Sequence, residues 1–240
     1  MTSHETPAQG EILPALSVVV PTRNAAAHLL AVALELRRVL DACQLPYECW
    51  YVNDASTDAT AEQLAALAAQ WPQLGYVSLA RNAGQWLAGA AGLAQTRAPV
   101  IAQLDDDGEH PPRLVPELLR LLECYQAAQL VYALPQHRRT GVRKLAERLT
   151  GQPAASSFRV FRAGLLPAHR RLPMHFEAWE QQQLQPAQRR YLTYTAPASR
   201  RAKSSYSRMQ KLGLVARHIT RKRFTDWPQI AMRHSPRVGR

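Results

Sequence analysis

The chain has 240 residues, of which 46% are hydrophobic, and this excludes a disordered protein and favours one globular domain with an appendage. The formal net charge of +12 is uneven, because residues 1–136 carry 7 Lys and Arg against 14 Asp and Glu, and residues 137–240 carry 23 against 4. This asymmetry predicts an acidic half that holds a cation and a basic half that meets polyanions, whether phosphates, nucleic acid or an anionic membrane face.

Strand and helix patterns alternate along the first 135 residues. Short β-branched runs predict buried strands, and longer alanine- and leucine-rich segments with helical spacing predict the helices between them. The expected strands cover residues 15–24, 47–54, 74–80, 98–107 and 128–135, and the expected helices cover residues 25–43, 55–72, 82–96 and 112–128. We expect Ser56 and Thr57 to cap the second helix. The order predicts an α/β fold with a Rossmann-like, mostly parallel sheet flanked by helices.

The pattern loosens after the fifth expected strand. The sequence predicts a short helix over 142–151, mixed strand and helix signals over 157–166, and a basic amphipathic helix over 206–224. The tail over 225–240 contains turn residues and charge, and we expect it to be mobile. The expected divisions are a flexible lead-in over 1–14, an α/β domain over 15–200, and a basic helical extension and tail over 201–240.

Three adjacent aspartates, Asp105, Asp106 and Asp107, end the fourth expected strand. Adjacent like charges resist burial and need open water or a cation. Side chains at i and i+2 of an extended chain point to the same side, so Asp105 and Asp107 can share one cation, and hard carboxylate oxygens suit Mg²⁺ or Mn²⁺. The alternative is that the three aspartates lie in a solvated loop, bind no cation and only favour the solubility of this part of the sheet.

Polar residues also follow two other expected strands, Asp54 after the second and Arg81 with Asn82 after the third. Ligands of parallel α/β sheets bind at the carboxyl ends of the strands, so these residues and the aspartates predict one composite site. Asp54 could accept a hydrogen bond from the N–H edge of a nucleobase, or it could simply cap the helix that follows it.

Four segments together resemble one known family. They are LSVVVPTRN, YVNDASTD, LARNAGQWLAGAAGLAQT and VIAQLDDDGEHPPRLVPELL. Their order and spacing resemble family 2 glycosyltransferases of the GT-A fold, in particular the branch with dolichyl-phosphate mannose synthase and bacterial polyprenyl-phosphate sugar transferases. The resemblance implies a metal-dependent, inverting transfer of a sugar from a UDP- or GDP-sugar to a polyprenyl phosphate. The sequence departs from the family pattern at Asn53, Ala25 and Ser205, which stand in the places of two acids and a lysine.

The resemblance also implies roles for individual positions. The residues expected at the nucleotide-sugar donor are Pro21, Thr22, Asp54, Arg81, Asp105 and Asp106. The residues expected to hold Mg²⁺ or Mn²⁺ are Asp105, Asp107 and Glu109. The residues expected at the acceptor or at phosphates are Arg138, Arg139, Arg159, Lys203 and Ser205. The expected catalytic residues are Asp105, Asp107, Glu109 and Arg159.

The sequence also indicates where the protein is located and leaves other functions open. Three cysteines without CxxC spacing indicate a reducing cytosol, and neither a signal peptide nor a run of about 18 apolar residues is recognisable. We expect a cytoplasmic protein that meets the inner membrane face peripherally, through its basic helix or a membrane partner protein, unless that helix face is merely solvated. Other open readings are a transferase to a soluble or polysaccharide hydroxyl, with Glu109 or Asp107 as base, and a silent nucleotide-sugar-binding paralogue. A nucleic-acid-binding protein is a further alternative, which the basic half suggests, but it leaves the acids unexplained and we expect no nucleic-acid partner.

Overall fold

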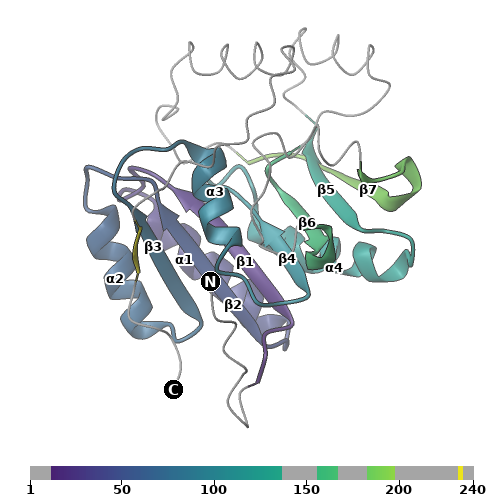
Figure 1. Ribbon diagram of the computed structural model, residues 1–240, viewed down its shortest axis with the longest axis horizontal. Coiled ribbons are helices and arrows are strands. Elements are labelled where there is room, and N and C mark those ends of the chain that lie inside the picture. The colour runs from purple at the N-terminus through teal and green to yellow at the C-terminus, as the bar shows by residue number, and fades with distance from the viewer. Residues whose placement is uncertain (1–11, 137–155, 167–182, 198–231, 235–240) are drawn as a thin grey trace, which may run out of the picture.

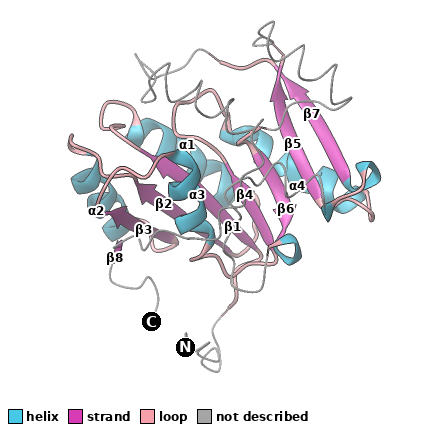
Figure 2. Ribbon diagram, turned by 45° about the horizontal axis from the view of Figure 1, so that its top comes forward, coloured by secondary structure: helices cyan, strands magenta, loops and turns pink. Residues whose placement is uncertain are grey.

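The computed structural model describes residues 12–136, 156–166, 183–197 and 232–234. Within them, eight strands form one sheet in the order β7-β5-β6-β4-β1-β2-β3-β8 (Figure 2). The strands are β1 (Leu16–Thr22), β2 (Tyr47–Asn53), β3 (Leu74–Leu79), β4 (Val100–Gln103), β5 (Leu130–Pro135), β6 (Arg159–Arg162), β7 (Arg189–Tyr194) and β8 (Met232–His234). The helices are α1 (Leu29–Ala42), α2 (Thr60–Gln70), α3 (Gln85–Leu93) and α4 (Val115–Cys124), with short 3₁₀ turns η1 (Pro112–Leu114), η2 (Ala163–Leu165) and η3 (Pro186–Gln188).

The strand directions bring most strand ends to one side of the sheet. Strands β1 to β5 and β7 run parallel, whereas β6 is antiparallel to β4 and β5, and β8 is antiparallel to β3. The first residue of β6 pairs with the last of β4, and the first residue of β8 pairs with the last of β3. The ends of the parallel strands and the beginnings of β6 and β8 therefore share one edge, which we call the carboxyl edge.

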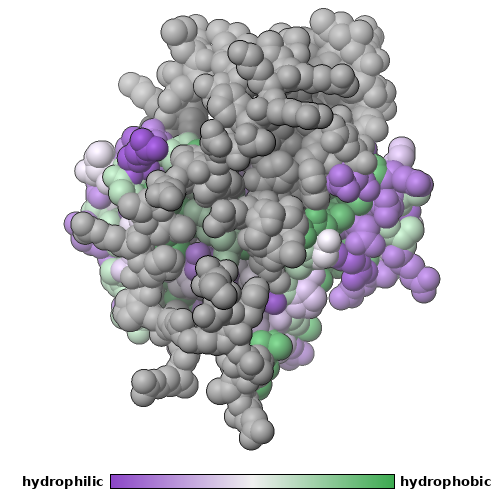
Figure 3. All heavy atoms as spheres, in the orientation of Figure 1, coloured by the Kyte–Doolittle hydropathy of each residue, from purple (hydrophilic) through white to green (hydrophobic). Residues whose placement is uncertain are grey.

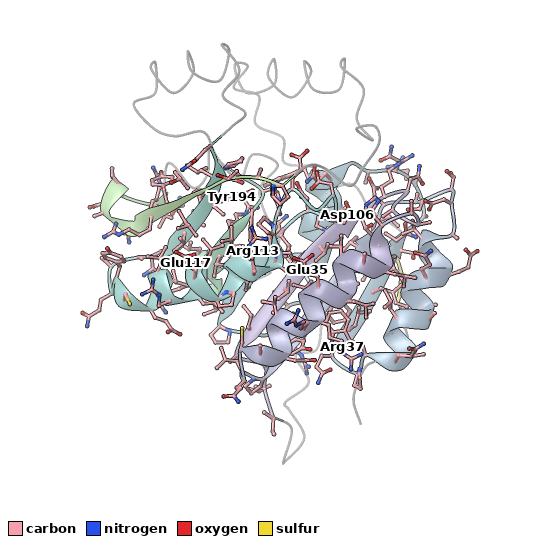
Figure 4. The ribbon with its side chains drawn as sticks, turned by 180° about the vertical axis from the view of Figure 1, so that it is seen from behind. Glu35, Arg37, Asp106, Arg113, Glu117 and Tyr194 are labelled. Atoms are coloured by element: carbon pink, nitrogen blue, oxygen red, sulfur yellow. The ribbon has the colours of Figure 1, made fainter. Side chains whose placement is uncertain are left out.

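Helices cover both faces of the sheet. Alternation along β1 turns Val18 and Val20 toward α1, α2 and α4, which form one core with them, and turns Val19 toward α3 on the opposite face. Figure 1 shows α3 in front of the sheet, and Figure 4 shows α1 over the reverse face. The mostly parallel, helix-flanked α/β sheet expected from the sequence is confirmed.

Helix α3 lies close to the sheet because of a glycine. A Cβ atom at Gly92 would lie 2.5 Å from Val19 Cγ1 and 2.9 Å from Val52 Cγ2. Both valines are fully buried and rotationally restricted, so neither can move aside without shifting its strand.

We therefore expect Gly92→Ala to destabilise the fold. Overpacking costs about 1–3 kcal/mol, and contacts of 2.5 and 2.9 Å with two buried valines place this variant in the upper part of that range, above the gain of about 1 kcal/mol in helix propensity. Urea denaturation should show a lower midpoint for this variant. Gly164→Ala is the matched control, because a Cβ there meets nothing within 4 Å. Equal midpoints for Gly92→Ala and wild type would contradict this packing.

Several expected boundaries are corrected. The second helix begins at Thr60 and not at residue 55, and Ser56 and Thr57 do not cap it. The Ser56 hydroxyl instead accepts the backbone N–H of Asn24, and the Thr57 N–H donates to the Asn24 side chain. The Asp58 carboxylate accepts the Thr60 N–H at 3.0 Å and so closes the first turn of α2.

Two strands were not expected. Strand β7 was missed, and Figure 3 shows that the side of the molecule with β7 and α4 carries many hydrophilic side chains. The expectation of a mobile tail is wrong for Met232–His234, which forms β8, and the mixed signals over 157–166 correspond to β6 and η2. The expected helices over 142–151 and 206–224 lie outside the described residues, and the division at residue 200 stays a prediction. No helix among the described segments is long and apolar enough to cross a membrane.

Candidate active site at the carboxyl edge

The expected site residues of the first 135 positions lie at the carboxyl edge. Asp54 follows β2, Arg81 follows β3, and Asp105 to Asp107 occupy the loop after β4, which ends at Gln103. Thr22 at the end of β1 donates its hydroxyl to Asp106, which Figure 4 labels at this edge. The expected residues Arg138, Arg139, Lys203 and Ser205 lie outside the described residues, so their roles stay predictions.

The carboxylate of Asp105 is bound from two sides. The Gln85 amide, at the first position of α3, donates to Oδ1, and the Ser157 hydroxyl, just before β6, donates to Oδ2 at 2.8 Å. The Asp105 side chain is 17% exposed. One carboxylate thus joins three segments that are far apart in the sequence.

His110 fixes the backbone of the same loop. Its Nδ1 accepts the Asp105 backbone N–H at 2.9 Å, which requires this nitrogen to be unprotonated. The same Nδ1 atom lies 3.6 Å from Asp105 Oδ2. The imidazole stacks on Phe158, with ring centroids 5.2 Å apart.

Tyr194 supports the loop from β7. Its hydroxyl donates to the backbone oxygen of Glu109 at 3.1 Å, and its ring contacts Phe158 edge-on at a centroid distance of 6.2 Å. His110, Phe158 and Tyr194 form a group that we call the aromatic support, because it holds the loop of acids at two backbone positions.

The three aspartates face different surroundings. Asp106 is 2% exposed and turns into the protein, where it accepts the Thr22 hydroxyl. Asp106 also affects Tyr51. Burial raises the pKa of the Tyr51 hydroxyl well above its ordinary value, and the nearby Cys49 and Asp106 raise it further. Asp107 remains partly exposed and accepts the Glu109 N–H at 2.9 Å. Asp105 and Asp107 are therefore the more accessible pair of the three.

Asp54 has a defined role within the fold. Its carboxylate is 1% exposed and accepts the backbone N–H groups of Ala83 at 2.6 Å and Gly84 at 2.9 Å. Gly84 has a φ of 90°, a conformation that favours glycine. Asp54 thus holds the turn that begins α3, and the alternative that it caps the following helix α2 is wrong. Its expected contact with a nucleobase stays a prediction.

Arg159 is buried at the start of β6, where it pairs with the last residue of β4. It is 3% exposed, donates from Nη2 to Gln103 Oε1 at 2.7 Å, and lies over the Phe161 ring. A Cβ at Gly89 of α3 would lie 2.5 Å from Gln103 Nε2, so this glycine leaves room for the amide. The expected role of Arg159 at a phosphate stays a prediction. Pro21 is buried and Arg81 is exposed at the same edge.

The donor chemistry of the edge fits a hard divalent cation. Asp105, Asp107 and Glu109 offer partly exposed carboxylate oxygens, which suit Mg²⁺ or Mn²⁺. In the described part of the chain, no three His, Cys, Asp or Glu side chains converge to form a full ligand set. The protein would thus supply few ligands, as is usual for Mg²⁺ that also binds water and substrate phosphates.

Sequence reasoning missed Gln85, Ser157 and Tyr194 as site residues. Gln85 directly follows the Asn-Ala-Gly turn after an expected strand end, and this position could have indicated it. Ser157 lies two residues before Arg159, on the same side of an extended chain. For Tyr194 we find no signal, because its strand was not expected.

The comparisons with known proteins agree with this arrangement. The mostly parallel, helix-flanked sheet places the chain among the α/β folds, in which ligands bind at the carboxyl ends of the strands. The family model for glycosyl transferase family 2 matches residues 17–195, and the chain belongs to this family. The family expected from the sequence is thereby confirmed.

Two relatives carry the same name, undecaprenyl-phosphate 4-deoxy-4-formamido-L-arabinose transferase. The protein from Yersinia enterocolitica is 33% identical over 147 residues, 59% of this chain and 43% of the relative. The protein from Serratia proteamaculans is 36% identical over 118 residues, 47% of this chain and 35% of the relative. The chain therefore spans less than half of the length of these relatives.

Solved structures show the fold. Glucosyl-3-phosphoglycerate synthase from Mycobacterium tuberculosis, solved with Mn²⁺ and uridine-diphosphate-glucose, matches with a TM-score of 0.66. The match covers 93% of this chain and 87% of that chain at 19% identity. The chain thus has the GT-A fold that was expected.

Proposed function

We propose that the chain is a metal-dependent, inverting glycosyltransferase that moves a sugar from a UDP- or GDP-sugar to a polyprenyl phosphate. The main support is the Asp105 carboxylate, which Gln85 and Ser157 orient at the carboxyl edge, in the same loop as the partly exposed Asp107. The names of the two undecaprenyl-phosphate transferases support the acceptor, and the Mn²⁺ and UDP-glucose of the synthase structure support the donor and cation.

Each residue then has a chemical task. Asp105, Asp107 and Glu109 would hold Mg²⁺ or Mn²⁺, which would supply positive charge opposite the leaving diphosphate. Pro21, Thr22 and Asp54 contact the nucleoside, and Asp106 accepts the Thr22 hydroxyl and so holds it. Arg81 and Arg159 provide positive charge for the donor phosphates. A phosphate acceptor is ionised at neutral pH, so it attacks the anomeric carbon directly without a general base.

The topology supports an anionic acceptor. Residues 137–155 connect the end of β5 to the start of β6, and residues 198–231 lie between the end of β7 and the start of β8, so both segments connect points at the carboxyl edge. Together they carry 14 Lys and Arg against 2 Asp and Glu. Positive charge tethered at this edge favours a phosphate over a neutral hydroxyl. Arg138, Arg139, Lys203 and Ser205 belong to these segments and are our proposed acceptor contacts.

The same charge suits a peripheral protein. We place the chain on the cytoplasmic side, where its basic segments meet anionic lipid headgroups or a membrane partner protein. From this position the protein reaches the phosphate group of polyprenyl phosphate at the cytoplasmic surface of the membrane.

Nucleotide binding should depend on a divalent cation. We expect calorimetry to detect binding of UDP or GDP in the presence of Mn²⁺ and a loss of about 100-fold or more in affinity with EDTA, because the cation would supply positive charge for the diphosphate. AMP with Mn²⁺ is the control ligand and should not bind with comparable affinity. Equal affinity with Mn²⁺ and EDTA would contradict metal dependence, and absence of all binding would contradict the donor site.

The acceptor requires a second experiment. UDP- and GDP-sugars are incubated with the protein and either polyprenyl phosphate or polyprenol in detergent. Product formed only with the phosphate supports the proposal. Product formed equally with polyprenol would show a hydroxyl acceptor instead.

A further inference from the structure

We propose that Gln85 is a positioning residue that, together with Ser157, sets the orientation of Asp105 for the cation and diphosphate. This inference rests on the proposed function. It assigns a task to the first residue of α3 and links the start of this helix to the loop of acids.

The geometry around Asp105 is a two-sided clamp. Gln85 donates to Oδ1 from the α3 side, and Ser157 donates to Oδ2 from the β6 side. The two donors lie 20 and 52 residues from Asp105 in the sequence. With one hydrogen bond on each oxygen, rotation of the carboxylate would break both bonds, so its plane is fixed before a ligand arrives.

Gln85 is itself held in place. Asp54 accepts the N–H groups of Ala83 and Gly84, the two residues directly before Gln85. The Ala88 N–H donates to the Gly84 oxygen at 3.0 Å, which fixes the first turn of the helix. The buried Asp54 thus anchors the turn from which Gln85 reaches Asp105, and two carboxylates of the site are connected through α3.

The chemical nature of both donors matters. An amide and a hydroxyl stabilise an ionised carboxylate but do not neutralise it, whereas a Lys or Arg in the same place would form an ion pair. An ionised carboxylate has about four acceptor positions, and the clamp uses one on each oxygen. The remaining positions and the full negative charge stay available for a cation.

The test is the Mn²⁺ dependence of nucleotide binding by the full chain. Mn²⁺ is titrated in the presence of UDP or GDP, whichever wild type binds, and complex formation is followed by calorimetry. Gln85→Met keeps the length of the side chain and removes the amide. We expect it to raise the Mn²⁺ concentration for half-maximal binding about 10-fold, as is typical for the loss of a group that orients a metal ligand. Ser157→Ala should have the same signature.

Two readouts separate positioning from a loss of structure. Nucleotide binding in EDTA and the melting temperature should stay at their wild-type values in Gln85→Met. Gln95→Met is the matched control, because Gln95 lies just beyond the opposite end of α3. It should leave the Mn²⁺ dependence unchanged.

Each outcome is decisive. An unchanged Mn²⁺ dependence in Gln85→Met would overturn the inference while leaving the proposed function intact. Equal weakening with Mn²⁺ and with EDTA would show that the residue only supports α3 and would also overturn it. No Mn²⁺-dependent binding by wild type would instead overturn the proposed function, and the inference with it.

Discussion

Asp107→Ala is expected to weaken nucleotide binding in the presence of Mn²⁺ by about 100-fold or more. Even the loss of a group that only orients a metal ligand costs about 10- to 100-fold, and removal of a proposed ligand should cost at least the upper value. Asp107 is partly exposed beyond the end of β4, and Asp106 is turned into the protein. No neighbouring aspartate can therefore replace it without rearranging the loop.

The measurement is calorimetric titration with UDP or GDP and Mn²⁺. Glu123→Ala is the control, because it removes one negative charge from an exposed position of α4. This control should keep the wild-type affinity, and both variants should keep the wild-type melting temperature. If Asp107→Ala bound as tightly as Glu123→Ala, the proposed cation site at this residue would be wrong.

Phe158→Ala is expected to lower the stability strongly, with a loss of about 3–5 kcal/mol in the free energy of unfolding. The side chain is fully buried, stacks on His110 and contacts Tyr194 edge-on. Its removal leaves a cavity within the aromatic support, and His110 then loses the ring that it stacks on while its Nδ1 accepts the Asp105 backbone N–H. We therefore expect weaker Mn²⁺-dependent nucleotide binding as well as lower stability.

Phe161→Ala is the matched comparison. Phe161 is also fully buried on the short strand β6, but it packs in the core on the α3 side. Urea denaturation should show a similar loss for both variants. Calorimetry at a temperature where both are folded should show the larger loss of nucleotide affinity in Phe158→Ala. Equal losses of affinity would mean that the aromatic support has no special connection to the acids.

The elements that the sequence predicted correctly share a strong local signal. The strands β1 to β5 are short apolar runs, and α1 to α4 have long apolar stripes, so local periodicity was sufficient to find them in order. Strand β7 lacks this signal, because its residues Arg189–Tyr194 alternate irregularly between buried and accessible positions. Strand β8 has three residues and is stabilised by pairing with β3, which the tail sequence does not reveal.

The sequence predicted which residue types form the site and that they lie at the carboxyl edge of the sheet. It did not predict most of the contacts between them. The position of Asp54 and Asp105 after strands followed from the rule for parallel sheets. Their partners did not, because Gln85 and Ser157 approach Asp105 only through the tertiary fold. For the same reason, the start of α2 was misplaced: Ser56 and Thr57 bond to Asn24, which is more than 30 residues away.

Because β6 runs antiparallel to β4 and β5, the connection that precedes it can change in length during evolution. The connection from β5 to β6 begins and ends at the carboxyl edge, so the chain does not have to cross a face of the sheet to link these two strands. Doubling the length of such a connection costs only about 0.6 kcal/mol in closure entropy. Insertions and exchanges there can therefore change the side chains at the carboxyl edge, while the strands and the acids that follow β4 remain as they are.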